Sequence, residues 1–203
     1  DASGAPSVAD VLDALPAVHS TGGARGERSL VVRGFAPLHT GLLVDGLPAD
    51  LAFDGRLDLG KLPAAWLRHV TVHGGVTSGD VDCAGLGATV DIRTRRPGEG
   101  PLAELAAEST WPGRLAVSGF HHHRGERVAD VLGAGVERRA AFTLPDGSER
   151  ANSASRRFHF LGRTSWDVAE GHRLGAGLRY VDAAFGVPPA TRGDYVRYWR
   201  FSA

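Results

Sequence analysis

The stretch ATVDIRTRRP, residues 88–97, separates two parts of the sequence that differ in texture. Within it, Val90 and Ile92 alternate with charged side chains, and this period of two predicts a strand that ends before the proline. The segments before it are short and mix helical with strand periodicity, whereas those after it are long and alternate throughout. We therefore expect two domains, over residues 1–97 and 98–203.

Residues 1–97 predict a small α+β domain with a mixed sheet of short strands. Ser7 and Asp10 have the spacing of a capping box, at the start of an amphipathic helix that Pro16 ends. Asp45 and Gly46 lie between two short apolar runs, and this pattern predicts a β-hairpin. The other expected elements are strands over 29–35, 68–73 and 88–94, a short helix over 64–67, and loops over 19–28, 50–58 and 74–87.

Residues 98–203 predict about five antiparallel strands with one apolar and one polar face. In the first of them, Leu105 and Trp111 share one face, whereas Glu104 and Glu108 share the other. Lipid on one side and water on the other would explain this alternation. No segment reaches the ~18 uninterrupted apolar residues of a transmembrane helix. The expected strands cover 102–111, 114–122, 128–142, 158–168 and 173–180, with a polar loop over 145–155.

Composition narrows the possible functions. The chain has 23 basic and 23 acidic side chains, so its net charge gives no reason to expect a nucleic-acid partner. The single cysteine, Cys83, cannot form an intrachain disulfide and lacks the partners of a zinc knuckle or redox pair. No serine elbow, HExxH motif or paired-carboxylate motif occurs, so we expect neither an enzyme nor a cofactor.

Several histidines and charged residues permit a functional and a structural interpretation. His121 and His123 could converge on a metal from one face of a strand, but exposure to solvent or to a barrel lumen is the favoured interpretation. His69 and His73 would be metal-ligand neighbours on a helix, but the alternation around them predicts a strand. Arg33, Arg93 and Asp45 could clamp a charged ligand, although a structural role is favoured.

Five motifs in a fixed order give the first domain a family resemblance. They are SVADVLDALPAV (7–18), LVVRGF (30–35), LLVDGLP (42–48), LPAAWLRHVTVHGG (62–75) and GLGATVDIRTRRP (85–97). The domain resembles the plug of TonB-dependent outer-membrane receptors. Residues 98–203 are similar to the family's first barrel strands, and FGVPP (185–189) resembles a loop that follows an early hairpin.

The resemblance implies active import across a bacterial outer membrane. In this family a plug fills a barrel of about 22 strands, and the TonB–ExbB–ExbD complex supplies energy for uptake of a siderophore, cobalamin or another large solute. The barrel contacts outer-membrane lipid. About 22 strands of ~9–11 residues need roughly 200 residues before any loop, whereas 106 follow Pro97, so we expect an incomplete barrel and either a mature form or an excerpt.

Two stretches depart from the family pattern. A short apolar-led TonB box should precede the plug, and residues 1–6 contain no such segment. Asp80, Asp82 and Cys83 stand where the family usually has a small residue, a tyrosine and a glycine. The conformation and ligand contacts of that loop are therefore expected to differ.

The resemblance also places ligand contacts on the outward loops of the plug. Phe35, His39, Phe53 and Arg56 are the candidate ligand-binding residues, because they combine aromatic surface with hydrogen-bonding groups. A stand-alone, plug-like periplasmic or surface binding module without transport activity is the alternative function. A hydrolytic or metal-dependent enzyme is a third, which rests only on scattered histidines such as His121.

Overall fold

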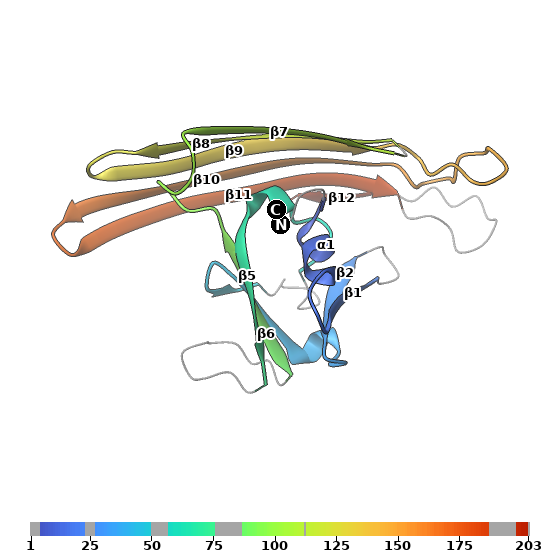
Figure 1. Cartoon of the computed structure of the whole chain (residues 1–203), viewed down its shortest axis with the longest axis horizontal. Coiled ribbons are helices and arrows are strands. Elements are labelled where there is room, and N and C mark those ends of the chain that lie inside the picture. The colour runs from blue at the N-terminus through green and yellow to red at the C-terminus, as the bar shows by residue number, and fades with distance from the viewer. Residues whose placement is uncertain are drawn as a thin grey trace. The chain divides into compact units, whose positions relative to one another are not determined.

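The computed structural model describes residues 5–22, 27–49, 57–75, 87–111, 113–186 and 198–202. The chain divides into two compact units, Asp1–Arg95 and Arg96–Ala203 (Figure 1). Over these residues, the first unit combines one short α-helix with two small sheets, whereas the second is a single sheet of long strands. Among the described residues, no helix is long and apolar enough to cross a membrane.

The helix α1 (Val8–Asp13) begins with the predicted capping box. The Ser7 backbone N–H donates to Asp10 Oδ2 at 3.1 Å, and the Asp10 N–H donates to Ser7 Oγ at 3.4 Å. These bonds satisfy backbone donors that the first turn of a helix leaves without an intrahelical partner. Val8, Ala9 and Leu12 are buried on one side of the helix, as the apolar spacing predicts.

The predicted loop over residues 19–28 was wrong at both ends. Strand β1 (Val18–Gly22) pairs antiparallel with β2 (Arg28–Val32) in a two-stranded sheet. β1 escaped prediction because only its first residue, Val18, is buried, so the strand has no apolar alternation. The Ser20 side chain of β1 accepts a hydrogen bond from the Arg28 guanidinium, which also bonds Asp10 and Asp13 of α1.

The predicted strand over 29–35 also ends earlier than expected. Arg33 and Gly34 have φ angles of 52° and 82°, so the chain turns after β2 rather than extending. The Phe35 N–H then donates to the Val32 carbonyl at 2.9 Å, which closes the turn. A 3₁₀ turn, η1 (Pro37–His39), leads into the next strand.

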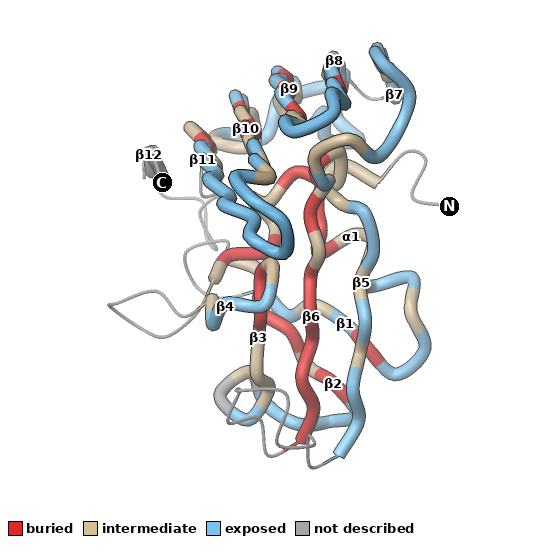
Figure 2. The backbone as a smooth tube through the Cα atoms, turned by 90° about the vertical axis from the view of Figure 1, so that its left-hand side faces the viewer, coloured by how far each residue is buried: buried red, intermediate tan, exposed pale blue. Residues whose placement is uncertain are grey.

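A mixed four-stranded sheet forms the rest of the first unit. It contains β3 (Thr40–Val44), β4 (Leu47–Pro48), β5 (Leu67–Gly74) and β6 (Ala88–Thr94), in the order β4-β3-β6-β5. β3 and β6 run parallel, whereas the other neighbours are antiparallel. β6 is buried almost throughout, on both of its faces (Figure 2). Buried side chains from α1, both sheets and Leu59 form one hydrophobic core.

Local signals located the two turns of this sheet. The hairpin between β3 and β4 lies at Asp45 and Gly46, with φ angles of 56° and 85°, as the Asp-Gly sequence predicts. The predicted helix before β5 is a single 3₁₀ turn, η2 (Ala64–Trp66). Its last residue, Trp66, is buried and fixes the start of β5.

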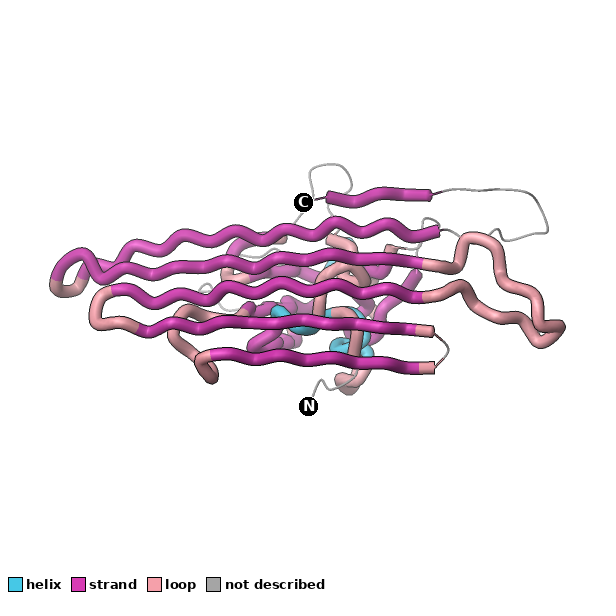
Figure 3. Tube along the Cα trace, turned by 90° about the horizontal axis from the view of Figure 1, so that it is seen from above, coloured by secondary structure: helices cyan, strands magenta, loops and turns pink. Residues whose placement is uncertain are grey.

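The second unit is an antiparallel sheet whose strands follow one another in chain order (Figure 3). The sheet is open, with β7 and β12 at its edges, and it is an incomplete barrel. Its strands are β7 (Ala103–Thr110), β8 (Arg114–Arg124), β9 (Val128–Arg139), β10 (Ser155–Ala169), β11 (His172–Gly186) and β12 (Tyr198–Ser202).

Two details of this sheet differ from the sequence prediction. β12 is a sixth strand that the sequence did not indicate, and β10 and β11 are longer than expected. The extra residues at the start of β10, 155–157, are polar or charged, and the first of them, Ser155, had been assigned to the loop over 145–155. Phe185 and Gly186, predicted as loop, still belong to β11 and pair with β12.

The register separates the sheet into an apolar and a polar face. On the apolar face, Val117, Val136 and Phe158 lie side by side on β8, β9 and β10, and all three are exposed. On the polar face, Glu137 forms ion pairs with Arg157 and with Arg114, and Arg114 also bonds Glu108 at 2.9 Å. The predicted two-faced pattern is therefore present along the sheet.

Candidate functional site

The candidate ligand site lies at one end of the four-stranded sheet. The parallel pairing of β3 with β6 places Thr40 opposite Ala88, and the antiparallel pairing of β5 with β6 places Gly74 opposite the same residue. The starts of β3 and β6 and the end of β5 therefore meet at this end, which we call the plug tip. Phe35 and His39, two of the predicted ligand-binding residues, precede β3 and lie at the plug tip.

Phe35 packs directly against the backbone of Gly87. A Cβ atom added to Gly87 would lie 2.2 Å from Phe35 Cγ, a separation that no real pair of carbon atoms adopts. Because Gly87 has no side chain, the ring can rest on the chain where β6 begins. Phe35 nevertheless remains 43% exposed, so an aromatic surface is available at the plug tip.

His39 combines a fixed backbone with an exposed side chain. Its carbonyl oxygen accepts a hydrogen bond from the Gly87 N–H at 3.0 Å, and the Gly87 carbonyl accepts one from the Gly75 N–H at 3.2 Å. The three segments of the plug tip are thus tied together by backbone bonds. The His39 side chain lies on the surface beside them.

Arg33 also belongs to the plug tip. It lies in the turn after β2, is exposed, and places its guanidinium against Gly74, where an added Cβ would come within 2.7 Å of Nη1. The sequence could not indicate this position, because it depends on a left-handed turn and on the absence of a side chain at Gly74. The cation of Arg33, the aromatic ring of Phe35 and the imidazole of His39 therefore all come from residues 33–39.

Arg93 and Asp45 do not join Arg33 in a clamp. Arg93 Nε donates to Asp91 Oδ2 at 2.7 Å. Asp45 accepts hydrogen bonds from the Thr94 N–H at 2.9 Å and from Thr94 Oγ1 at 2.8 Å, at the far ends of β3 and β6. Arg93 therefore pairs within β6, and Asp45 joins the hairpin after β3 to the end of β6, so neither residue belongs to the plug tip.

Other candidates from the sequence either lie elsewhere or lie outside the described residues. Phe53 and Arg56 fall outside them, as do Asp80, Asp82 and Cys83. His69 and His73 are on the strand β5, as the alternation predicts. Within the described ranges, no group of three or more histidine, cysteine, aspartate or glutamate side chains could hold a metal ion.

Comparison with a family model identifies the first unit. Residues 1–89 match the model of the TonB-dependent receptor plug domain. A search of curated proteins finds no match. The matched residues include α1, β1 to β5 and the plug tip with Phe35, His39 and Arg33.

Solved structures extend the likeness to the second unit. The pyoverdine receptor FpvA from Pseudomonas aeruginosa is 18% identical, with a TM-score of 0.71, over 90% of this chain and 26% of that one. The alcaligin receptor FauA from Bordetella pertussis is 18% identical, with a TM-score of 0.70, over 89% and 30% of the two chains. The copper transporter OprC is 14% identical, with a TM-score of 0.70, over 89% and 28%.

This chain thus spans less than a third of each of these structures. The shared part includes the plug fold and the early strands of the barrel. TonB-dependent receptors are outer-membrane proteins. Residues 1–89 therefore match the plug-domain model of TonB-dependent receptors, and the chain has the fold of that plug domain followed by the first strands of the receptors' outer-membrane barrel.

Proposed function

We propose that this chain is the ligand-receiving part of a receptor for energised uptake of a scarce solute such as an iron–siderophore or cobalamin. In this proposal residues 1–97 are the plug and residues 98–203 begin the barrel. The names of the matched structures support the class of solute, since FpvA is bound to pyoverdine, FauA is an alcaligin receptor and OprC is a copper transporter. They are receptors and transporters, which favours a function other than catalysis.

The plug tip is the observation that carries the proposal. Phe35 offers apolar ring surface, Arg33 offers a permanent cation with several donors, and His39 offers an imidazole. A polar organic chelate presents carbonyl and anionic oxygens around an apolar scaffold, so this combination suits it. We propose that Phe53 and Arg56 contribute to the same site.

The polar face of the sheet supports transport rather than a purely structural role. Glu108 and Glu137 balance the charges of Arg114 and Arg157 on that face, so it can border water without an excess of charge. The opposite face is apolar and exposed, as lipid contact requires. We propose that the TonB–ExbB–ExbD complex provides the energy, through strand addition by a segment that precedes the plug.

The alternative is a plug-like binding module that works without transport. Such a module would keep the plug tip but would have no use for strands of 15 residues with an exposed apolar face, as in β10 and β11. This feature favours the receptor. A module would also bind its ligand without any dependence on TonB.

Ligand binding in detergent solution tests the site. Ferric siderophores and cobalamin would be titrated against the protein, with binding followed by quenching of tryptophan fluorescence. We expect Phe35→Ala and Arg33→Gln each to weaken binding of the recognised solute about tenfold, which corresponds to one lost contact of about 1.4 kcal/mol. Leu47→Ala is the matched control, because Leu47 is exposed at the opposite end of the same sheet. If Phe35→Ala and Arg33→Gln bound the solute as tightly as Leu47→Ala does, the plug tip would not be the binding site.

A further inference from the structure

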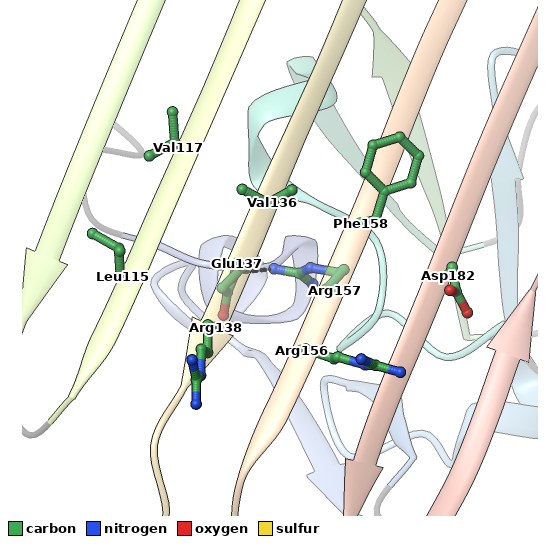
Figure 4. A pocket seen from close by; sticks show the side chains of 9 residues that line it. All are labelled: Leu115, Val117, Val136, Glu137, Arg138, Arg156, Arg157, Phe158 and Asp182. Carbon is green, nitrogen blue, oxygen red and sulfur yellow. Dashed lines mark hydrogen bonds and ion pairs between the residues drawn. The ribbon is translucent and has the colours of Figure 1, made fainter.

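A groove runs across the apolar face of the second unit. It has a volume of about 420 Å³ and crosses β8, β9, β10 and β11 (Figure 4). Leu115, Val117, Val136 and Phe158 form its apolar lining, and all four side chains are exposed. The Phe158 ring is also 6.2 Å from the ring of Tyr180, which lies on the same face of β11.

Two arginines close one end of the groove. Arg138 on β9 is directly opposite Arg156 on β10, and Leu115 on β8 is opposite Arg138 on its other side. All three therefore share the apolar face. Like charges at directly opposed positions of two strands destabilise a sheet, so an unneutralised pair of arginines is unfavourable here.

Neither arginine is neutralised within the described part of the chain, where no ion pair or hydrogen bond involves either guanidinium. Glu137 and Arg157 also line the groove, but the register places them on the polar face, where they pair with each other. Asp182 on β11 lines the groove directly opposite Phe158 and diagonal to Arg156. It interacts with a residue other than Arg156. The arginine pair thus presents uncompensated positive charge beside an apolar surface.

The length of the connections indicates which side of the membrane this end occupies. At one end of the sheet, three residues connect β8 to β9 and two connect β10 to β11. At the other end, three residues connect β7 to β8, but residues 140–154 connect β9 to β10. Barrels of the outer membrane have short periplasmic turns and longer extracellular loops. Arg138 and Arg156 adjoin the long connection, so they lie toward the outer leaflet.

The spacing of polar residues along β9 agrees with a position of Arg138 near the edge of the membrane's apolar layer. Asp130 and Arg138 lie on the apolar face with only Leu132, Ala134 and Val136 between them on that face. From Asp130 to Arg138 the strand advances eight residues, at about 3.4 Å each. When the strand is tilted by about 40° from the membrane normal, this length covers roughly 20 Å of membrane height, close to the ~25 Å apolar band of such barrels. Near the short turns, Asp130 Oδ2 lies 3.5 Å from His123 Nδ1. At the opposite rim, Arg138 and Arg156 have no acidic partner among the described residues.

We infer that this groove binds a phosphate-bearing lipid of the outer leaflet, with its phosphate held between Arg138 and Arg156 and an acyl chain along Val117, Val136 and Phe158. The planar guanidinium matches the geometry of phosphate oxygens, and two of them together suit a doubly charged group. A free phosphate would use the arginines alone and ignore the groove. The lipid uses both, so it is the occupant that accounts for the whole surface.

Native mass spectrometry of the protein in detergent tests this inference, with diphosphorylated lipid A as the probe. Arg138→Gln combined with Arg156→Gln is expected to weaken lipid A binding by at least about tenfold. Val117→Trp should have a similar effect by filling the groove while both arginines remain. Arg124→Gln combined with Arg127→Gln removes the same charge near the short turns and should leave binding unchanged.

Three results would overturn the inference. One is equal lipid A binding by the wild-type protein and the Arg138/Arg156 variant, and another is an equal loss in the Arg124/Arg127 control, which would indicate nonspecific charge attraction. The third is binding of inorganic phosphate as tight as that of lipid A. The inference depends on the sheet crossing the outer membrane and does not depend on which solute is transported, so the two proposals can fail separately.

Discussion

At the scale of single residues, the plug tip depends on glycines that leave room for larger neighbours. Gly87 and Gly74 accept Phe35 and Arg33 against their backbones, and neither contact is visible in the sequence. The motifs indicated glycine-rich turns in this region, and the resemblance directed attention to Phe35 and His39. Which side chains rest on which glycine is decided by strands that are paired far apart in the chain.

Gly87→Ala should displace the Phe35 ring. The added Cβ has no space between the backbone and Phe35 Cγ, so the ring must swing away at a cost of about 1–3 kcal/mol. We expect weaker solute binding, similar to that of Phe35→Ala, and reduced stability in urea unfolding. Gly22→Ala is the control, since nothing lies within 4 Å of a Cβ there and little change is expected. Unchanged binding by Gly87→Ala would contradict the role of the Phe35 ring.

Asp10 makes the plug sensitive to acid. Burial raises the pKa of its carboxyl, but hydrogen bonds from Ser7 and Arg28 and the positive charge of Arg28 outweigh it, so the pKa lies below the usual 3.8. Because the folded-state pKa is depressed, its stabilising contribution is complete above about pH 4 and is lost as the pH falls below 3.8 through the folded-state pKa. Asp10→Asn should remove this part of the acid sensitivity and cost about 1 kcal/mol at neutral pH.

The measurement is urea unfolding of residues 1–97 at several pH values. Trp66 is the only tryptophan in this segment and is buried, so its fluorescence reports the unfolding of the core. An identical pH profile for the wild type and Asp10→Asn would contradict the assignment.

At the scale of elements, local chemistry was predictable and long-range pairing was not. The capping box of α1 and the Asp45–Gly46 turn are encoded within a few residues, and both predictions were confirmed. β1 was missed because its stability comes from pairing with β2 and from Arg28, which bonds side chains of α1 and β1. The residues next to β1 in the sequence do not indicate that it pairs with β2 or that Arg28 bonds one of its side chains.

The hairpin between β3 and β4 should be sensitive to Asp45→Ala. This change removes both hydrogen bonds to Thr94 and places alanine at a φ of 56°, which alanine tolerates poorly. We expect a loss of about 2–3 kcal/mol in the free energy of unfolding of residues 1–97, again followed through Trp66. Asp45→Asn, which tolerates the left-handed region and keeps one acceptor, should lose less. A larger loss for asparagine than for alanine would contradict this explanation.

At the scale of the whole molecule, the two-faced alternation correctly indicated an open sheet of barrel strands, whereas the site was only partly predictable. Phe35 and His39 were proposed from the resemblance, and the structure places both at the plug tip, where their role in binding stays a prediction. Arg33 was assigned a structural role, because a sequence does not show that the chain reverses after Val32. The paired charges of Arg114, Glu137 and Arg157 come from three strands and could not be matched from alternation alone.

The two units should differ in what solvent they require. Residues 1–97 have a compact core and should fold in water, whereas residues 98–203 carry an exposed apolar face and should stay dispersed only in detergent. Expression of each segment, followed by sedimentation with and without detergent, measures the difference. A second segment that is soluble and unfolds cooperatively in water would contradict its assignment to a membrane barrel.

Energised uptake is the central claim, and accumulation of a labelled solute by cells that produce the receptor tests it most directly. The solute identified by fluorescence titration would be supplied to otherwise identical cells with and without a functional TonB. The account predicts accumulation that requires TonB and that falls when the plug tip carries Phe35→Ala, while Leu47→Ala has no effect. Equal accumulation with and without TonB, or binding to the cells with no accumulation in either, would contradict it and favour a binding module.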